Sequence, residues 1–573
     1  MSEGAVGAVA KEKPRFVRAL AALKDRRMLA MLLLSFAAGL PYGAVLGTLN
    51  AWLTIEGITP STIGVLSIIT LGYSFKYLWA PAFQTPKLIP FQRLGARRSW
   101  LLMFQVPMAA LLALLALTNP AENIGFVALL ALVIALMSAT HDIVLDAWRI
   151  EVARSEEDKD IMSALYQFGY RLSGFITGFI ALLLAARLGW TAVYVIIGAM
   201  MAIAALGTLV APEPDETINR DENRPSFFNS LPTKIRRIST ICISIGWLVA
   251  AAMIVLFMTQ ALILETNPSA RNFVRNQGPI IVGLTVLMPA VIAAYLLYNW
   301  KPLAQTGAIR SEGSGISRAL FRAIFDPLLD LIERMRWGVI LVLLLALTYR
   351  FTDAVWGSFA YPFYLDDRFG ALHHTMDDVA IASKFFGVLM TISGAALGAV
   401  VIAFVGRMPV LIIGAVLAAA TNLLFADLSA GGSGMDAFLA LTYLDGPLIA
   451  FAEWAAVISP DPVAPDQGQR MARLMMAIAG ENLAGGFASV AIVAYLTSVV
   501  NPRFAAVQYA LLGSLTMLLG TLGRSWLGEM IEAQGYYTVF IITFWLGMIA
   551  VALCVMETVR RAFVVRDQEL ASV

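Results

Sequence analysis

Charged residues are scarce in this chain of 573 residues: they make up only 14% of it, whereas 59% of the residues are hydrophobic and the mean hydropathy is +0.76. So much apolar surface cannot be buried inside one water-soluble core. The sequence therefore predicts an integral membrane protein surrounded by the lipid bilayer. The 41 basic and 39 acidic residues nearly balance, so no nucleic-acid partner is indicated.

Cysteine and histidine are also rare. The two cysteines, Cys242 and Cys554, lie in apolar runs and are too few for a disulfide scaffold or a metal site. Among the histidines, His373 and His374 are neighbours in a loop and His141 stands alone, which gives no metal-ligand set. The spans also lack a nucleophile with a base and an orienting group. We therefore expect no metal, no cofactor and no enzymatic activity.

Apolar runs of about 20 residues, the length that crosses a bilayer, fill most of the chain. We assign an N-terminal six-helix bundle to residues 28–211, a C-terminal six-helix bundle to 338–557, and two extra central helices, 239–264 and 279–300, to the linker 212–337. The bundle spans are expected at 28–53, 61–83, 99–117, 124–148, 163–186, 190–211, 338–363, 379–405, 408–426, 475–499, 504–527 and 536–557. This all-α plan of 14 spans fits alternating access, in which two halves rock around a central site.

One more apolar run, 436–458, is interrupted by acidic residues and a proline. If it crossed the membrane, the two basic tails, 1–27 and 558–573, would lie on opposite faces. We therefore expect segment 429–470 to be an insert on the outer face that lies against the membrane or re-enters it. Most Lys and Arg then fall in inner segments, so both termini are expected in the cytoplasm. The first tail does not have the pattern of a signal peptide.

Ionisable residues within spans are the strongest functional signal, because a charge in lipid needs a partner or a water-filled path. Asp142 lies about 9 Å from the inner end of its span, and Lys76 and Arg171 reach about 10 to 13 Å. We expect these two cations to compensate Asp142 and Asp146. The cluster is either a structural ion pair or a site where Asp142 gains and loses a proton as access alternates.

Two neighbours of Asp142 have separate interpretations. His141 could join a proton relay, because imidazole exchanges protons near neutral pH, or it could only hydrogen-bond a neighbouring helix, which we favour. Asp146 lies with Arg149 and Glu151 near the membrane edge. There we expect a solvated helix end that belongs to the gate.

The second half carries its own charges inside the spans. Arg350 and Asp353 share a helix face near the midplane, while Lys384 and Glu481 lie about 8 to 9 Å from the outer ends of their spans. Arg350 is the residue that we most expect to meet an anionic substrate, since its fork of donors can clamp a carboxylate or phosphate. An intrahelical pair between Arg350 and Asp353 is the alternative.

Aromatic and amide side chains of the first bundle suit sugar rings. In the first span Gly39, Gly43 and Gly47 repeat at four-residue spacing, which permits close helix packing. The candidate cargo contacts of this bundle are Tyr42, Asn50, Trp52, Tyr73, Gln105 and Tyr170. An aromatic belt at the membrane interface would also explain many such residues.

Several stretches carry a family resemblance: 35–41 (SFAAGLP) leading to 51–53 (AWL), 75–81 (FKYLWAP), 142–148 (DIVLDAW), and 481–486 (ENLAGG) followed by 493–496 (VAYL). In this order they resemble the AmpG muropeptide permeases of the major facilitator superfamily. The agreement runs through both halves and covers most of the two bundles.

This resemblance implies a major facilitator fold with two extra central spans and a multi-pass importer in the bacterial inner membrane. The cargo would be N-acetylglucosaminyl-1,6-anhydro-N-acetylmuramyl peptides, carried in with protons for peptidoglycan recycling and for the signal that induces β-lactamase and antibiotic resistance. It favours Asp142 for proton coupling, with Lys76 and Arg171 as its partners. Arg350, Asn482 and the first-span face would contact cargo. We expect a monomer.

The chain departs from the family pattern in three places. His141 stands where relatives usually have glutamine, and Gln84 stands where the superfamily has an aspartate, although Arg97 and Arg98 remain. The 429–470 insert is the third departure. One alternative is a relative that carries another bulky anion such as acetyl-coenzyme A. A non-transporting sensor and an intramembrane wall-processing enzyme are alternatives from other classes.

Overall fold

The computed structural model describes residues 25–56, 73, 76–83, 94–214, 232–262, 270–304, 326–356, 360–365, 367–456 and 467–571, and its regular elements in these ranges are all helices. Nine of the described helices are long and apolar enough to cross a membrane, or ten if one bent pair counts as a span. The predicted all-α membrane class is therefore confirmed. The predicted span 61–83 lies largely outside the described residues.

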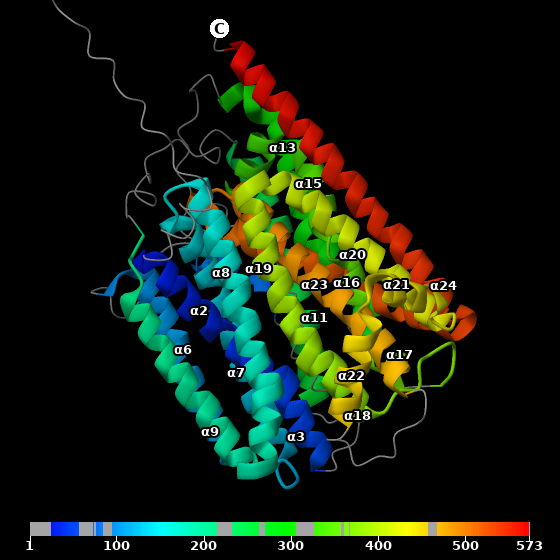
Figure 1. The fold of residues 1–573 in the computed structure, drawn as a ribbon. Helices are drawn as coiled ribbons and strands as arrows, with labels where there is room; N and C mark the ends of the chain where they lie inside the picture. The colour runs from blue at the N-terminus through cyan, green and yellow to red at the C-terminus, as the bar shows by residue number, and fades with distance from the viewer. Residues whose placement is uncertain are drawn as a thin grey trace, which may run out of the picture.

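The helices of the first bundle pack side by side on one flank of the molecule (Figure 1). They are α2 (Arg26–Gly43), η1 (Ala44–Thr48), α3 (Leu49–Ile55), η3 (Lys76–Leu78), η4 (Ala80–Phe83), α6 (Ala96–Leu115), α7 (Ile124–Val152), α8 (Glu156–Phe175), η7 (Ile176–Ile180) and α9 (Ala181–Val210). Close packing of α2 on α8 and η7 explains two of the predicted glycines: a Cβ on Gly39 would overlap the Ser173 hydroxyl of α8, and one on Gly43 would overlap the Thr177 hydroxyl of η7. Gly47 has no such neighbour.

The second bundle lies beside the first and has the same kinds of interruption. Its elements are α15 (Gly338–Thr348), α16 (Phe351–Trp356), α17 (Ala360–Leu365), α18 (Met376–Val379), η10 (Ala380–Gly387), α19 (Val388–Val405), α20 (Arg407–Ser429), α21 (Ser433–Thr442), α22 (Asp445–Ala456), α23 (Gln467–Val499), η11 (Pro502–Phe504) and α24 (Ala505–Ala571). The π-helical turns η1, η7 and η10 and the break between α15 and α16 divide predicted spans into shorter helices. Such irregular turns frequently occur at functional sites.

Glycines with positive φ make equivalent turns in the two bundles. Gly95 (φ 91°) precedes α6 and Gly406 (φ 86°) precedes α20, so each lets an arginine-bearing helix begin after a sharp turn. Gly189 and Gly535, both at φ 78°, separate consecutive spans inside α9 and α24. A residue with a Cβ would be strained at all four positions.

The two extra central helices are α11 (Thr233–Leu262) and the chain of α12 (Ala270–Val282), η9 (Gly283–Leu287) and α13 (Met288–Ala304). They pack on each other, and α12 also packs on α24 of the second bundle. The Tyr77 hydroxyl lies 2.6 Å from the Thr285 hydroxyl, which ties η9 to the first bundle. The extra pair therefore contacts both bundles.

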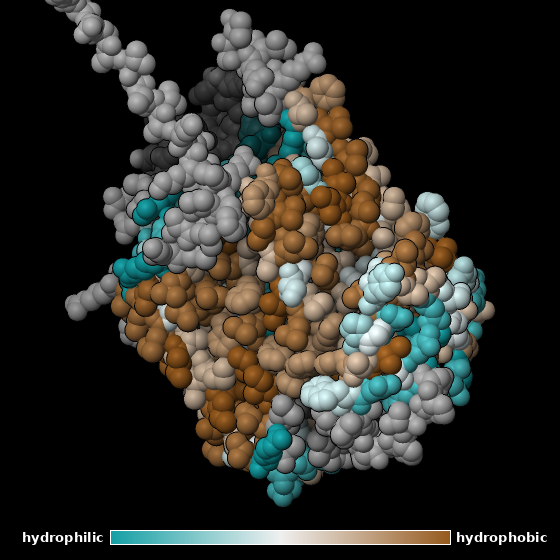
Figure 2. Space-filling model, in the orientation of Figure 1, coloured by the Kyte–Doolittle hydropathy of each residue, from teal (hydrophilic) through white to brown (hydrophobic). Residues whose placement is uncertain are grey.

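The segment predicted to be an outer-face insert contains two helices, α21 and α22, bent by 105° at a short break. Asp427 accepts hydrogen bonds from the backbone N–H of Gly434 (3.0 Å) and Met435 (2.6 Å), and Arg473 holds Asp436 at 2.6 Å. Hydrophilic side chains gather around this region, whereas hydrophobic side chains cover the flank of the bundles (Figure 2). The sharp bend, rather than one straight helix, is the geometry of a re-entrant or broken segment.

Candidate functional site

One lysine faces two buried carboxylates in the first bundle. Lys76 Nζ in η3 lies 3.8 Å from Asp142 Oδ2 and 3.7 Å from Asp146 Oδ2 of α7. Asp142 and Asp146 are one helical turn apart, so they share a face. The other carboxylate oxygen of each, Oδ1, has no hydrogen-bond partner among the described residues. Lys76 is the cation that both carboxyl groups share, and Arg149 is a second cation that contacts Asp146 only, so Asp142 has the weaker charge compensation among the described ion pairs.

The C-terminal end of α7 is buried, which contradicts our expectation of a solvated helix end at Asp146, Arg149 and Glu151. Their exposed fractions are 3%, 0% and 4%. Glu151 forms a two-point ion pair with Arg97 at 2.6 and 2.8 Å, which is the partner that the sequence left unassigned. Packing by neighbouring helices, which helix length alone does not reveal, removes this end from water.

The Arg149 guanidinium lies between two tyrosine rings that come from different bundles. Its carbon is 4.8 Å from the ring centre of Tyr166 in α8 and 4.8 Å from that of Tyr509 in α24. Arg149 Nη2 is also 3.3 Å from Asp146 Oδ1. Asp146, which shares Lys76 with Asp142, therefore connects through Arg149 to a cation–π contact across the bundle interface.

His141 hydrogen-bonds a neighbouring helix of its own bundle, as we favoured from the sequence. Its Nε2 is 3.0 Å from Gln105 Nε2, and Thr208 donates to Gln105 Oε1 at 2.6 Å. Both His141 and Gln105 are fully buried. Gln105, predicted as a cargo contact, is instead part of this helix-to-helix network.

The tyrosines predicted as cargo contacts lie together. The Tyr42 ring is 5.1 Å from the Tyr73 ring and 5.8 Å from the Tyr170 ring. Trp52 does not join them: it stacks on Trp190 at 5.9 Å and is only 4% exposed, so in this structure it packs within its own bundle. The Asn50 side chain lies outside the described part of the structure.

A second charged cluster forms where the two bundles meet. Arg350, at the break between α15 and α16, lies 3.3 Å from Asp353, as the intrahelical alternative predicts. Glu481 interacts electrostatically with Asp353, Arg350 and Arg171. Asn482 donates to Glu481 Oε2 at 2.8 Å and accepts from Thr391 at 2.8 Å. The Lys384 side chain lies outside the described residues.

Arg171 belongs to this second cluster in the structure. Its electrostatic neighbours are Arg350, Tyr170, Tyr42 and Asp353, whereas those of Asp142 are Lys76 and Asp146. The expected pairing of Arg171 with Asp142 is therefore absent from the described contacts, and Lys76 alone faces Asp142. Helix depth placed Arg171 at the right level but did not show which helix it faces.

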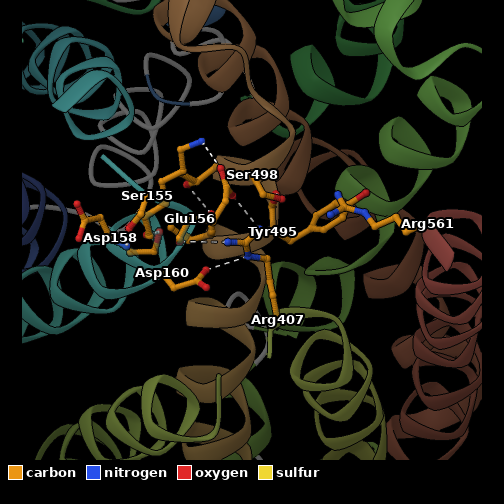
Figure 3. A network of polar contacts seen from close by, with 12 residues as sticks. Ser155, Glu156, Asp158, Asp160, Arg407, Tyr495, Ser498 and Arg561 are labelled. Atoms are coloured by element: carbon orange, nitrogen blue, oxygen red, sulfur yellow. Dashed lines mark hydrogen bonds and ion pairs between the residues drawn. The ribbon is translucent and has the colours of Figure 1, made fainter. Parts of the chain in front are cut away.

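A polar network that the sequence did not predict joins the bundles at the predicted cytoplasmic face (Figure 3). Arg407, at the start of α20, donates from Nε to Asp160 at 2.8 Å and from Nη1 to Glu156 at 3.1 Å, and both acceptors are on α8. Burial raises the pKa of Asp160, although Arg407 opposes this shift. The available signal was an isolated arginine after Gly406 facing an acidic helix start at Glu156.

Comparisons with known proteins agree with this membrane architecture. Residues 27–194 match the family model described as acetyl-coenzyme A transporter 1. The anhydromuropeptide permease of Escherichia coli K12 is 40% identical over 195 residues, which are 34% of this chain and 38% of that protein. A Rickettsia felis protein named as transporter AmpG 4 is 24% identical over 527 residues, 92% of this chain and 95% of its own length.

Two solved structures align at low identity with nearly the whole chain. The human organic anion transporter MFSD10 gives a TM-score of 0.49 at 14% identity over 95% of this chain and all of that chain. The proton:xylose symporter XylE gives 0.49 at 12% identity over 94% of both chains. The chain is thus a multi-pass membrane protein that is similar to proteins named as AmpG transporters and anhydromuropeptide permeases, over a third of its length in one case and over nearly all of it in the other.

Proposed function

We propose that this permease imports anhydro-muropeptides across the bacterial inner membrane together with protons. The observation that carries the proposal is the buried arrangement of Lys76 between Asp142 and Asp146 at 3.8 and 3.7 Å, in a chain related to a named anhydromuropeptide permease. Asp146 has a second cation in Arg149 at 3.3 Å, whereas Asp142 only shares Lys76, so Asp142 is the carboxyl group that would more readily take up a proton. Asp142 is deeper in its span than Asp146, and it is the leading candidate for the coupling group.

The cargo would bind between the bundles, next to this cluster. Tyr42, Tyr73 and Tyr170 offer aromatic faces to sugar rings, and Arg350 offers a charged fork to a carboxylate. Asp353, Glu481 and Asn482 complete the wall contributed by the second bundle. The acidic and basic side chains on this wall suit the peptide part of the cargo better than they suit a neutral sugar.

Release into the cytoplasm would require the bundles to separate at the face where Arg407 holds Glu156 and Asp160. In this structure that contact is made. Near the opposite face the bundles touch through other contacts, such as the Phe179 and Phe385 rings at 5.3 Å. If the two sets of contacts broke in turn, the protein would have the two access states of a rocking carrier. Both termini are proposed to be cytoplasmic.

Uptake of labelled anhydro-muropeptide into proteoliposomes tests the proposal. We expect accumulation with an inwardly directed proton gradient and only equilibration without one. Imported muropeptide would then supply recycling and the β-lactamase-inducing signal. Equal uptake with and without the gradient would exclude proton coupling.

A second candidate cargo, acetyl-coenzyme A, follows from the family model that matches residues 27–194. Both cargoes are bulky anions, so the charged cluster alone does not separate them. Competition does: an excess of unlabelled acetyl-coenzyme A should leave muropeptide uptake unchanged. If acetyl-coenzyme A itself accumulates and muropeptide does not, the cargo assignment is wrong.

A further inference from the structure

Two arginines from different bundles lie close to each other in the central cluster. Arg171 is on α8 of the first bundle, and Arg350 is at the break between α15 and α16 of the second. Arg171 interacts electrostatically with Arg350, and also with Asp353 of the second bundle. Two like charges at a shared, partly buried interface are unfavourable unless an anion lies between or beside them.

Neither guanidinium is fully satisfied by the protein. Arg171 Nε and Arg350 Nε are buried and have no hydrogen-bond partner in the part of the chain that the structure describes. Asp353 lies 3.3 Å from Arg350, yet its Oδ2 also lacks a well-aligned hydrogen bond. The side chains of Arg350 and Asp353 are 16% and 20% exposed. A buried donor without a partner costs free energy, which a ligand that supplies an acceptor would recover.

The acidic members of the cluster come from the second bundle alone. Glu481 on α23 interacts electrostatically with Asp353 and with both arginines, and Asn482 fixes its Oε2 at 2.8 Å. Two guanidinium and two carboxylate groups sum to no net charge. A simple anion would meet repulsion from Asp353 and Glu481, and a neutral sugar would leave the donors unpaired. A ligand group that carries both a positive and a negative charge can pair with the two guanidinium groups and the two carboxylates together.

We propose that Arg171, Arg350, Asp353 and Glu481 bind an amino-carboxylate group of the cargo, with its carboxylate between the two arginines and its ammonium against the two acids. The inference rests on the proposed transport function for the identity of the cargo. Because the carboxylate contacts one arginine from each bundle, bound cargo draws the bundles together at this level. Arg171 is therefore a cargo-binding residue rather than a partner of Asp142.

Binding and uptake, measured separately, test the site. The probes are a labelled anhydro-muropeptide with free carboxylate and ammonium groups, the same molecule with its carboxylates amidated, and the same molecule with its amine acetylated. Binding is measured to the full-length protein in nanodiscs and uptake in proteoliposomes. The proteins are the wild type, Arg171→Gln, Arg171→Lys, Glu481→Gln and a control, Arg237→Gln, whose side chain is exposed on α11.

We expect amidation to weaken binding to the wild type and to Arg237→Gln by about tenfold or more, since charge-assisted hydrogen bonds are lost. Amidation should have little further effect on Arg171→Gln, and acetylation little further effect on Glu481→Gln. Arg171→Lys keeps the positive charge, so it should still bind the parent probe more tightly than the amidated probe, although by a smaller factor than the wild type. This partial preference would show that the site is folded in the Arg171 variants.

The outcomes separate the two proposals. Wild-type protein that binds and imports the amidated and acetylated probes as well as the parent would overturn the inference and leave the proposed function standing. Discrimination in binding without any uptake would support the site and overturn the proposed transport function. Absence of binding by all probes would overturn both.

Discussion

At the scale of single residues, the position of Asp142 links the sequence to the proposed coupling chemistry. Its depth in the span predicted that it would need a cation, and Lys76 lies 3.8 Å away. Lys76 also reaches Asp146 at 3.7 Å, so the lysine keeps a carboxylate partner if Asp142 is neutralised. This second partner makes a clean test of Asp142 possible.

Asp142→Asn is expected to abolish gradient-driven accumulation of cargo while preserving exchange of labelled for unlabelled cargo. The amide has nearly the shape of the carboxyl group but cannot gain or lose the proton. Uptake and counterflow in proteoliposomes measure the two properties, with Asp367→Asn, at an exposed loop position, as the control. Full gradient-driven uptake by Asp142→Asn would remove Asp142 from the coupling step.

The hydrogen bond between His141 and Gln105 predicts a structural role for the histidine. His141→Gln can keep a hydrogen bond to Gln105 and should retain stability and coupling. His141→Leu leaves the buried Gln105 amide unpaired and should lower the free energy of unfolding by about 1–3 kcal/mol while coupling persists. Unfolding in detergent and the pH profile of uptake measure these effects. A changed pH profile in His141→Gln would assign His141 to the proton path instead.

Residue depth could be predicted from the sequence, but residue neighbours could not. The rise per residue placed Asp142, Lys76 and Arg171 at one level, yet only the packing shows that Arg171 faces Arg350. In the same way Trp52 and Gln105 have the side chains of a sugar site but face the core of their own bundle. A helix fixes the angle between its own side chains, whereas the partner of each face depends on tertiary contacts.

At the scale of helices, the short turn between α19 and α20 forms the clearest contact between the bundles at the predicted cytoplasmic face. Gly406 lets α20 begin directly after α19, and Arg407 then reaches two acidic residues of α8. Glu156 is 61% exposed on its side chain, whereas Asp160 is 20% exposed. The pair with Asp160 should therefore contribute more than the pair with Glu156.

Arg407→Ala is expected to shift the protein toward the state that is open at this face. Loss of a partly exposed ion pair contributes about 1 kcal/mol, which corresponds to a population change of about fivefold. Distances between spin labels at positions 154 and 408 measure the two states. Lys159→Ala is the matched control, because Lys159 pairs with Glu156 at 2.7 Å within the same helix. An unchanged distance distribution in Arg407→Ala would contradict a gating role.

The insert helices α21 and α22 give a test of membrane topology. Tyr443, at the bend, is 83% exposed and should lie at the outer face. In a variant without Cys242 and Cys554, Tyr443→Cys should react with a membrane-impermeant maleimide added to spheroplasts. Arg154→Cys, exposed near the opposite end, should react only after permeabilisation. The reverse labelling would invert the predicted topology.

At the scale of the whole molecule, composition and hydrophobic runs were enough to predict an all-helical membrane protein. They did not predict where the spans are interrupted. The π-helical turns η1, η7 and η10 and the break at Arg350 have no hydrophobic period or composition that distinguishes them from the α-helices beside them. The extra central helices could be located by hydropathy, but their contact with both bundles, through Tyr77 on Thr285 and α12 on α24, depends on tertiary packing.

The proposed mechanism joins these scales, because a proton on one carboxyl group is coupled to movement of two bundles. Lys76, Asp146 and Arg149 connect Asp142 to the interface at Tyr509. Cargo bound between the bundles would act on the same interface from the central cluster. The central claim is thus that cargo and proton cross together.

Proton movement caused by cargo is the most direct test of this claim. Proteoliposomes that contain the wild-type protein and an internal pH-sensitive dye are given unlabelled anhydro-muropeptide outside, with no pH gradient imposed and with potassium and valinomycin clamping the membrane potential. The account predicts that the interior acidifies as muropeptide enters, and that Asp142→Asn shows no such change. Entry of muropeptide into wild-type vesicles without internal acidification would contradict it.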